Sequence, residues 1–332
     1  SSRLRHERPE LMATRSVPDG VQKMTVSLDP DDPGFLGYVC LGSGAGREFV
    51  AEALHDAVST TGARWLKLDF NVDPGSGCDR TDHGHGAGDG LLRHYEGLYA
   101  VLDAFRARHP EVILEACASG GLRIDLGLAR HVHCFFLSDP DWTEHHLQVL
   151  WGASLLLPPA AMLHWSWSQW RGENPDQDLD FASLDADRFT TMLRAAMLQR
   201  FGISLRVDEL PAGLQDVLAA EVDVYRREIA PLLREGVLRR LTGQPLRRGA
   251  GERCPAFQVD SAAGHLLAAF ALDGGASAPP LAFTGLIAGA TYEVRDLGSD
   301  AEPRRALGSE LMDAHPAAHP AASSRWMIAR RR

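Results

Sequence analysis

The chain has 332 residues, and its net charge of −10 argues against nucleic acid or an anionic membrane as a partner. With 45% hydrophobic and 23% charged residues, the composition is typical of a globular protein. The length exceeds what one core usually fills, so one large domain and a smaller one are expected, and no apolar run is long enough to span a membrane.

In chain order, residues 1–34 look irregular, and short apolar runs then alternate with amphipathic segments. Strands are expected over 37–41, 65–70, 112–117, 133–137, 161–165 and 203–207, and helices over 47–60, 91–109, 144–156, 185–200 and 214–233. This alternation predicts an α/β fold with a parallel sheet and helices outside it. A partial (β/α)8 TIM-type barrel is preferred, and a doubly wound sheet is the alternative.

The pattern changes near residue 240. Short strands between Gly- and Pro-rich turns are expected over 257–259, 266–272, 281–283 and 290–294. We therefore predict a catalytic (β/α) barrel portion over 1–238 and a C-terminal antiparallel, β-sandwich-like domain over 239–332. The basic ending, residues 328–332, is expected to be a solvated tail.

The cysteines show no paired metal or redox motif. Because no Cys-x-x-Cys pair exists, neither a zinc knuckle nor a redox pair is expected. Their odd number and wide spacing suit a reduced, cytoplasmic protein, although the start at Ser1 leaves an earlier targeting signal open. The five positions are Cys40, Cys78, Cys117, Cys134 and Cys254.

Polar residues gather where the predicted strands end, which is where a β/α barrel carries its reactive groups. Side chains alternate along a strand, so Lys67, Asp69 and Asn71 share one face of the strand at 65–70. A polar face is costly unless it lines a cavity, which favours a site. A structural Lys67–Asp69 ion pair at a barrel rim is the alternative.

The next strand, at 112–117, leads into a loop with little side-chain bulk. Cys117 ends the strand, and Ser119, Gly120 and Gly121 follow, so a backbone can approach a ligand closely there. A tight turn with Ser119 as a helix cap and a local Arg123–Asp125 ion pair is the alternative.

Two further strand ends carry candidate groups. Asp139 and Asp141 follow the strand at 133–137, and a helix N-cap is the alternative role, which fits Asp141 better than Asp139. His164 and Trp165 end the strand at 161–165, where aromatic rings suit the apolar face of a sugar, although plain packing would also explain the tryptophan.

Two other segments were weighed as cofactor sites. The glycines of 42–46 follow a predicted strand, but they lack the full G-x-G-x-x-G spacing of a nucleotide-binding turn. The loop 79–86 carries Asp79, Asp82, His83 and His85, but it has no H-E-x-x-H spacing. We therefore expect an ordered active-site loop with no metal and no organic cofactor.

Two carboxylates at one barrel mouth suggest glycoside hydrolysis, in which one attacks the anomeric carbon and the other protonates the leaving oxygen. A lysine beside the first carboxylate would keep it ionised, as the nucleophile requires. Lys67 beside Asp69 makes Asp69 the candidate for the ionised carboxylate.

Several motifs together resemble glycoside hydrolase family 36, the retaining α-galactosidases. The order and spacing agree over roughly residues 60–170, which is more specific than any single motif. K-L-D-F-N at 67–71 is similar to the family's K-W-D-M-N. The segments at 94–99, 115–125, 138–141 and 157–164 are similar to the motifs that follow it, and residues 308–312 match a late family segment.

The resemblance implies hydrolysis of terminal α-galactosides with retained configuration and without a cofactor. Asp69 would be the nucleophile and Asp139 the general acid/base, with the carboxyl groups about 5–5.5 Å apart. The rearranged motif S-D-P-D leaves Asp141 as a rival for the acid/base role. The residues that would bind the sugar are Lys67, Asn71, Cys117, Gly120, Gly121, Asp141, His164 and Trp165.

The chain also departs from the family. We expect this sequence to start near the end of the third barrel strand, after the family's N-terminal β-domain and first strands. Leu68 and Val72 replace a Trp and an Arg of the main motif. α-N-acetylgalactosaminidase activity or α-galactosyl transfer on the same site is one alternative, and a non-catalytic sugar-binding fragment is another. An α-galactoside oligosaccharide is the expected partner, with homo-oligomer formation left open.

Overall fold

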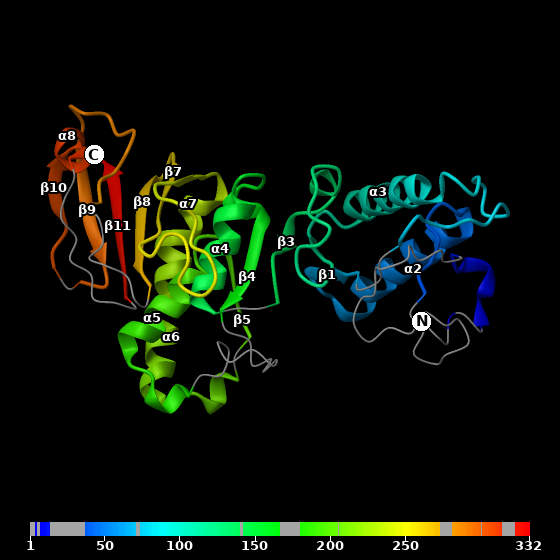
Figure 1. Cartoon of the computed structure of the whole chain (residues 1–332), viewed down its shortest axis with the longest axis horizontal. Coiled ribbons are helices and arrows are strands. Elements are labelled where there is room, and N and C mark those ends of the chain that lie inside the picture. The colour runs from blue at the N-terminus through cyan, green and yellow to red at the C-terminus, as the bar shows by residue number, and fades with distance from the viewer. Residues whose placement is uncertain are drawn as a thin grey trace. The chain divides into compact units, whose positions relative to one another are not determined.

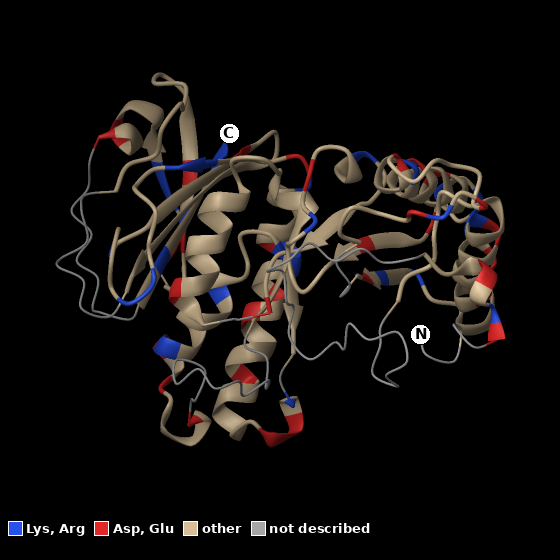
Figure 2. Ribbon diagram, turned by 45° about the vertical axis from the view of Figure 1, so that its right-hand side comes forward, with Lys and Arg blue, Asp and Glu red and all other residues tan. Residues whose placement is uncertain are grey.

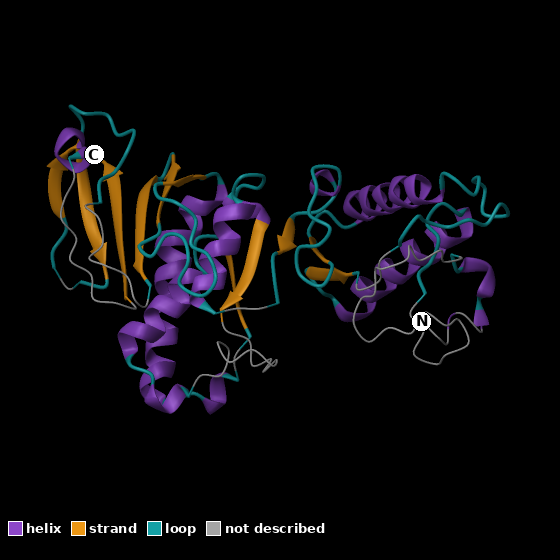
Figure 3. Cartoon of the chain, viewed as in Figure 1, coloured by secondary structure: helices purple, strands orange, loops and turns teal. Residues whose placement is uncertain are grey.

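The computed structural model of the chain describes residues 4, 7–13, 37–70, 74–139, 142–166, 180–204, 206–272, 281–299, 301–313 and 323–332. The chain consists of two compact units, Ser1–Phe135 and Phe136–Arg332. Figure 1 labels helices and strands of both units, and Figure 3 distinguishes helices from strands. Within the described residues, no helix is long and apolar enough to cross a membrane.

The first unit contains parallel strands that alternate with helices. Strands β1 and β2 pair in parallel over their full length, and Glu115 and Ala116 of β2 pair with the start of β3. The chain-order pairing confirms the parallel sheet that the alternation predicted. The elements are the 3-10 turn η1 (Pro9–Leu11), α2 (Gly44–Thr61), β1 (Trp65–Asp69), α3 (Gly90–Arg108), β2 (Ile113–Cys117), η2 (Leu128–Arg130) and β3 (Cys134–Phe136).

The strand expected over 37–41 is wrong. Among the described residues, 37–41 form a single antiparallel bridge, between Met12 and Val39, flanked by backbone bonds from the Ala13 N–H to the Tyr38 carbonyl and from the Cys40 N–H to the Leu11 carbonyl. A turn begins immediately afterwards, where the Ser43 N–H donates to the Cys40 carbonyl. The apolar run is therefore too short to continue as a strand before the turn that leads into α2.

The second unit begins with further β/α elements. Strands β4 and β5 pair in parallel, and the Leu137 N–H, directly after β3, donates to the Leu163 carbonyl of β4. The helix expected over 214–233 is present, but a π-helical turn interrupts it before Pro231. The elements are α4 (Thr143–Ala153), η3 (Pro159–Ala161), β4 (Met162–Ser166), η5 (Phe181–Ser183), α5 (Ala186–Ala195), β5 (Arg200–Ile203), η6 (Val207–Glu209), α6 (Ala212–Val224), the π-helix η7 (Tyr225–Ile229) and α7 (Ala230–Arg234).

The chain ends in an antiparallel sheet with the strand order β10-β9-β11-β8-β7-β6. Its core contains Tyr292, Leu267 and Phe283. Helices also connect to this sheet through the buried Arg194 of α5. Arg194 forms an ion pair with Glu221 of α6 and donates to the Leu297 carbonyl of β9. The elements are β6 (Val237–Arg240), β7 (Ala256–Ser261), β8 (Gly264–Ala271), β9 (Thr291–Leu297), β10 (Arg304–Leu307), α8 (Gly308–Met312) and β11 (Ser323–Arg331). The predicted antiparallel domain is therefore confirmed, whereas the boundary at 238/239 stays a prediction.

The solvated tail expected at 328–332 is wrong. Strand β11 lies between β8 and β9, and its Trp326, Ile328 and Ala329 are buried. The basic residues that suggested a tail form ion pairs instead, between Arg330 and Glu228 and between Arg332 and Glu293. Figure 2 shows charged residues of both signs along the helices and strands.

Candidate active site

The polar face of β1 lies beside matching polar residues of β2. In the parallel register, Lys67 is opposite Glu115, and Asp69 is opposite Cys117. Asp69 is exposed at the carboxyl end of its strand, whereas Cys117 is buried. The predicted strand-end group therefore consists of neighbouring residues on two strands.

Glu115 links this face together. The Trp65 indole Nε1–H donates to Glu115 Oε2 at 2.7 Å, and Lys67 Nζ lies 3.4 Å from Glu115 Oε1. The predicted alternative for Lys67 is an ion pair with Asp69, whereas in the structure Lys67 pairs with Glu115. Sequence reasoning did not select Trp65 or Glu115 as site residues, although Trp65 has the same strand parity as Lys67 and Asp69.

Cys117 is a neutral thiol beside the Asp69 carboxylate. Burial is the main cause that raises the pKa of Cys117 to about 11; the Gly120 amide and Lys67 act to lower it, and Asp69 acts to raise it. The thiol therefore stays protonated near neutral pH and can donate a hydrogen bond rather than act as a nucleophile. Asp69 also lines a hollow of about 280 Å³ that Phe70, His94 and Arg123 share.

The loop after β2 has the tight backbone that its glycines predicted. Ser119 and Gly120 have positive φ angles of 46° and 82°, and the Ala118 N–H donates to the Gly120 carbonyl at 2.8 Å. A positive φ at a non-glycine residue is a strained conformation of the kind that gathers at ligand sites. The Arg123 guanidinium lies over the Phe70 ring, at 4.8 Å, and Asp125 accepts from the Leu128 N–H.

In the second unit, Asp139 is exposed just after β3. The preceding Ser138 hydroxyl lies 2.8 Å from His145 Nε2 on α4, and Arg247 Nη2 lies 3.3 Å from His145 Nδ1. Burial, followed by Arg247, lowers the pKa of His145 to about 4, so its ring is neutral and Nε2–H donates to Ser138. This contact fixes the residue next to Asp139.

The other predicted residues differ in their surroundings. His164 is fully buried, with its ring 4.0 Å from that of His146 and 6.0 Å from that of Phe136. The Trp165 ring lies 4.5 Å from Phe136. Sugar binding by these two residues stays a prediction, as do the roles of Asn71 and Asp141, which lie outside the described residues.

The parallel strands that alternate with helices are those of part of a (β/α)8 barrel. The sequence model of the Melibiase family matches residues 43–236, more than half of the chain. The chain therefore belongs to the Melibiase family.

Curated relatives are α-galactosidases. The chain is 25% identical to α-galactosidase AgaA of Geobacillus stearothermophilus over 258 residues, covering 76% of the chain and 33% of that protein. It is 29% identical to α-galactosidase C of Emericella nidulans over 117 residues, covering 35% of the chain and 14% of that protein. The chain thus spans only part of the length of its relatives.

The solved structures confirm the predicted fold. The crystal structure of GH36 α-galactosidase AgaA from Geobacillus stearothermophilus superposes on 99% of the chain, with a TM-score of 0.73 at 19% identity, and the match covers 42% of that solved chain. Variants of that enzyme have been solved in complex with raffinose and with stachyose. The chain has the fold of the later barrel strands and C-terminal β-domain of GH36 α-galactosidases.

Proposed function

We propose that this chain carries the catalytic residues of a retaining α-galactosidase, with Asp69 as nucleophile and Asp139 as general acid/base. The observation that supports this best is the exposed Asp69 carboxylate at the carboxyl end of β1, beside Cys117 and on the polar face that Glu115 organises. Family membership and the α-galactosidase relatives support the reaction. The raffinose and stachyose complexes of the related enzyme support terminal α-galactosides as the substrate class.

In the first step, an Asp69 oxygen attacks the anomeric carbon and the bond to the leaving oxygen breaks. The Asp139 carboxyl gives its proton to that oxygen, and a covalent β-galactosyl ester forms on Asp69. The Cys117 thiol, which burial keeps protonated, donates a hydrogen bond to the Asp69 carboxylate or to a sugar hydroxyl.

In the second step, the Asp139 carboxylate takes a proton from water. The water oxygen attacks the anomeric carbon, the ester bond to Asp69 breaks, and galactose leaves with its original α configuration. Sugar hydroxyls would bind Lys67, Cys117, Asn71 and the backbone of Gly120 and Gly121. The strained turn at Ser119 and Gly120 supports this close approach.

The test compares hydrolysis of p-nitrophenyl α-D-galactopyranoside and of raffinose by the chain and by Asp69→Asn. We expect the variant to lose about 10³-fold or more in rate on both substrates, because no covalent intermediate can form. Its circular dichroism should stay unchanged, because Asp69 is exposed. A folded chain that hydrolyses neither substrate, or an Asp69→Asn variant with full activity, would contradict the proposal.

The acid/base assignment is tested with Asp139→Asn and its matched control Asp141→Asn. General acid catalysis contributes about 10²–10⁴-fold. Asp139→Asn should lose that much on raffinose but less on the p-nitrophenyl substrate, since p-nitrophenolate leaves without a proton. Azide should restore turnover of this variant and give the α-galactosyl azide. The same pattern in Asp141→Asn instead would transfer the role to Asp141.

A further inference from the structure

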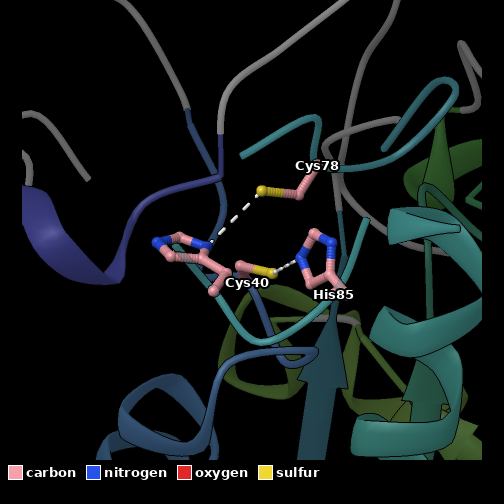
Figure 4. A group of neighbouring side chains, drawn as sticks. Cys40, Cys78 and His85 are labelled. Carbon is pink, nitrogen blue, oxygen red and sulfur yellow. Dashed lines mark hydrogen bonds between the residues drawn. The ribbon is translucent and has the colours of Figure 1, made fainter. Parts of the chain in front are cut away.

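Two cysteines and two histidines meet in the first unit, outside the residues that the proposed hydrolysis uses. The side chains of Cys40, Cys78, His83 and His85 are all buried, and their ligand atoms all lie within 4.8 Å of one another. Figure 4 shows Cys40, Cys78 and His85 close together, with the Cys40 sulfur directed at the His85 ring. We propose that these four residues bind a structural zinc ion.

The distances fit a tetrahedral Cys2His2 site. Cys40 Sγ lies 3.3 Å from His85 Nε2, and Cys78 Sγ lies 3.5 Å from His83 Nδ1. Zinc binds thiolate sulfur at about 2.3 Å and imidazole nitrogen at about 2.0–2.1 Å, so a tetrahedral angle puts sulfur and nitrogen about 3.6 Å apart. Both sulfur–nitrogen distances in the structure are close to that separation.

Each imidazole is oriented as a ligand. His83 Nε2 lies 3.0 Å from the Glu10 carbonyl oxygen, and His85 Nδ1 lies 2.9 Å from the Gly86 carbonyl oxygen. A carbonyl only accepts, so each of these nitrogens carries the N–H. The other nitrogen, Nδ1 of His83 and Nε2 of His85, therefore presents its lone pair to a sulfur. A backbone carbonyl on the remote ring nitrogen is a common support for metal-bound histidine.

The turn at Cys40 is also adapted to this arrangement. A Cβ at Gly42 would lie only 2.7 Å from His85 Cδ2, so glycine is needed for the ring to approach. At Gly90, a Cβ would collide with the Cys78 carbonyl oxygen at 1.8 Å, so glycine also allows α3 to pack against the second cysteine.

The cluster joins three chain segments. Among the described residues, Ala13, Cys40 and Cys78 form one buried apolar group, with Tyr38 packed against it. Arg80 donates to the carbonyls of Pro9 and Met12, which attaches the segment 9–13 to the same loop. A zinc ion would cross-link residues 40 and 78–85, and its binding free energy would stabilise the folded state.

The donor set favours zinc in a structural role. Thiolate and imidazole together select zinc over magnesium or calcium, which prefer oxygen ligands. Four buried protein ligands also leave no open position for a substrate, unlike the three ligands of a catalytic site. The proposal does not depend on the proposed hydrolysis, because the ligands and their support are separate from Asp69 and Asp139.

The test measures metal in the full chain, purified without chelator and desalted. Mass spectrometry of the elements should find about one zinc per chain, and cobalt(II) exchange should give the visible absorption of a tetrahedral site with a thiolate-to-cobalt band. Zinc content should fall to below about a tenth of an equivalent in Cys78→Ser and in His83→Ala. The control Cys254→Ser removes a buried cysteine outside the cluster and should keep its zinc.

If the variants fail to fold, alkylation of the wild-type chain still tests the proposal. With zinc bound, Cys40 and Cys78 should resist alkylation until the metal is removed, whereas the same reagent should reach both in the chelated protein. A zinc-free wild-type chain after refolding with excess zinc would overturn the proposal, and so would a Cys40–Cys78 disulfide in a peptide map. Hydrolysis assays on the same samples separate this outcome from failure of the proposed function.

Discussion

Two regions of the molecule are held together in different ways. One is the Cys2His2 cluster with its loops, residues 9–13, 38–43 and 77–86, and the other is the C-terminal antiparallel sheet. The sheet spreads its stability over many buried apolar side chains, among them Phe257, Phe270 and Trp326. The cluster depends on a few sulfur and nitrogen atoms held at defined distances. The sheet should therefore respond to lost volume, whereas the cluster should respond to displacement of a single ring.

The largest effect is expected from Trp326→Ala in β11. Trp326 is fully buried, with the Phe270 ring at 6.0 Å and the Arg194 guanidinium 5.7 Å from its own ring. Replacing a buried tryptophan by alanine costs about 3–5 kcal/mol through lost transfer free energy and the cavity that remains. Urea unfolding followed by circular dichroism measures this loss.

The matched control for Trp326 is Val237→Ala on β6 of the same sheet, whose side chain is 61% exposed. It should change the unfolding free energy by less than about 0.5 kcal/mol. Zinc content should be the same in both variants, because neither touches the cluster. A loss below about 1 kcal/mol in Trp326→Ala would show that the sheet does not depend on this core.

A smaller effect is expected from Gly42→Ala, which adds one methyl group beside His85. The new Cβ would meet His85 Cδ2 at 2.7 Å and Arg93 Cβ at 3.1 Å, so the ring must shift. Forcing an extra methyl group into a packed site costs about 1–3 kcal/mol, and here the shift also moves a proposed ligand. Chelator competition should show zinc held about tenfold or more weakly.

Gly88→Ala is the matched control for this change, because a Cβ there meets nothing within 4 Å and the residue lies in the same loop region. It should leave the zinc affinity unchanged. If both alanine variants hold zinc as the wild type does, the close contact between Gly42 and His85 has no part in binding.

The parts of the fold and site that could be predicted follow from local patterns. Strand β1 was expected over 65–70 and lies at Trp65–Asp69, because alternation of polar and apolar residues identifies a strand with two different faces. The same alternation predicted that Lys67 and Asp69 share a face. It could not give the Trp65–Glu115 contact, because that depends on the register between β1 and β2.

The errors arose where local sequence is ambiguous. Arginines at the end of the chain suggested solvent exposure, but Trp326, Ile328 and Ala329 directly before them are buried, and β11 pairs with a strand on each side. The cysteine–histidine cluster was not expected, because Cys40 and Cys78 are far apart in the sequence and match no short metal motif. Only the folded chain brings Cys40 next to the loop with His83 and His85.

The smallest effect is expected from Asp260→Asn in β7, where a few polar contacts connect strands of the sheet. Burial works to raise the pKa of Asp260, but bonds from His265, Arg239 and Gln258 outweigh it and hold the pKa below its ordinary value. A lowered folded pKa stabilises the protein above the unfolded pKa of about 3.9, and this contribution is lost as the pH falls through the folded value. Asp260→Asn should therefore unfold about 1 kcal/mol more easily at pH 7. The difference from the wild type should shrink below about pH 4 in urea titrations, whereas a difference that stays constant down to pH 2 would mean that the carboxylate charge is not responsible.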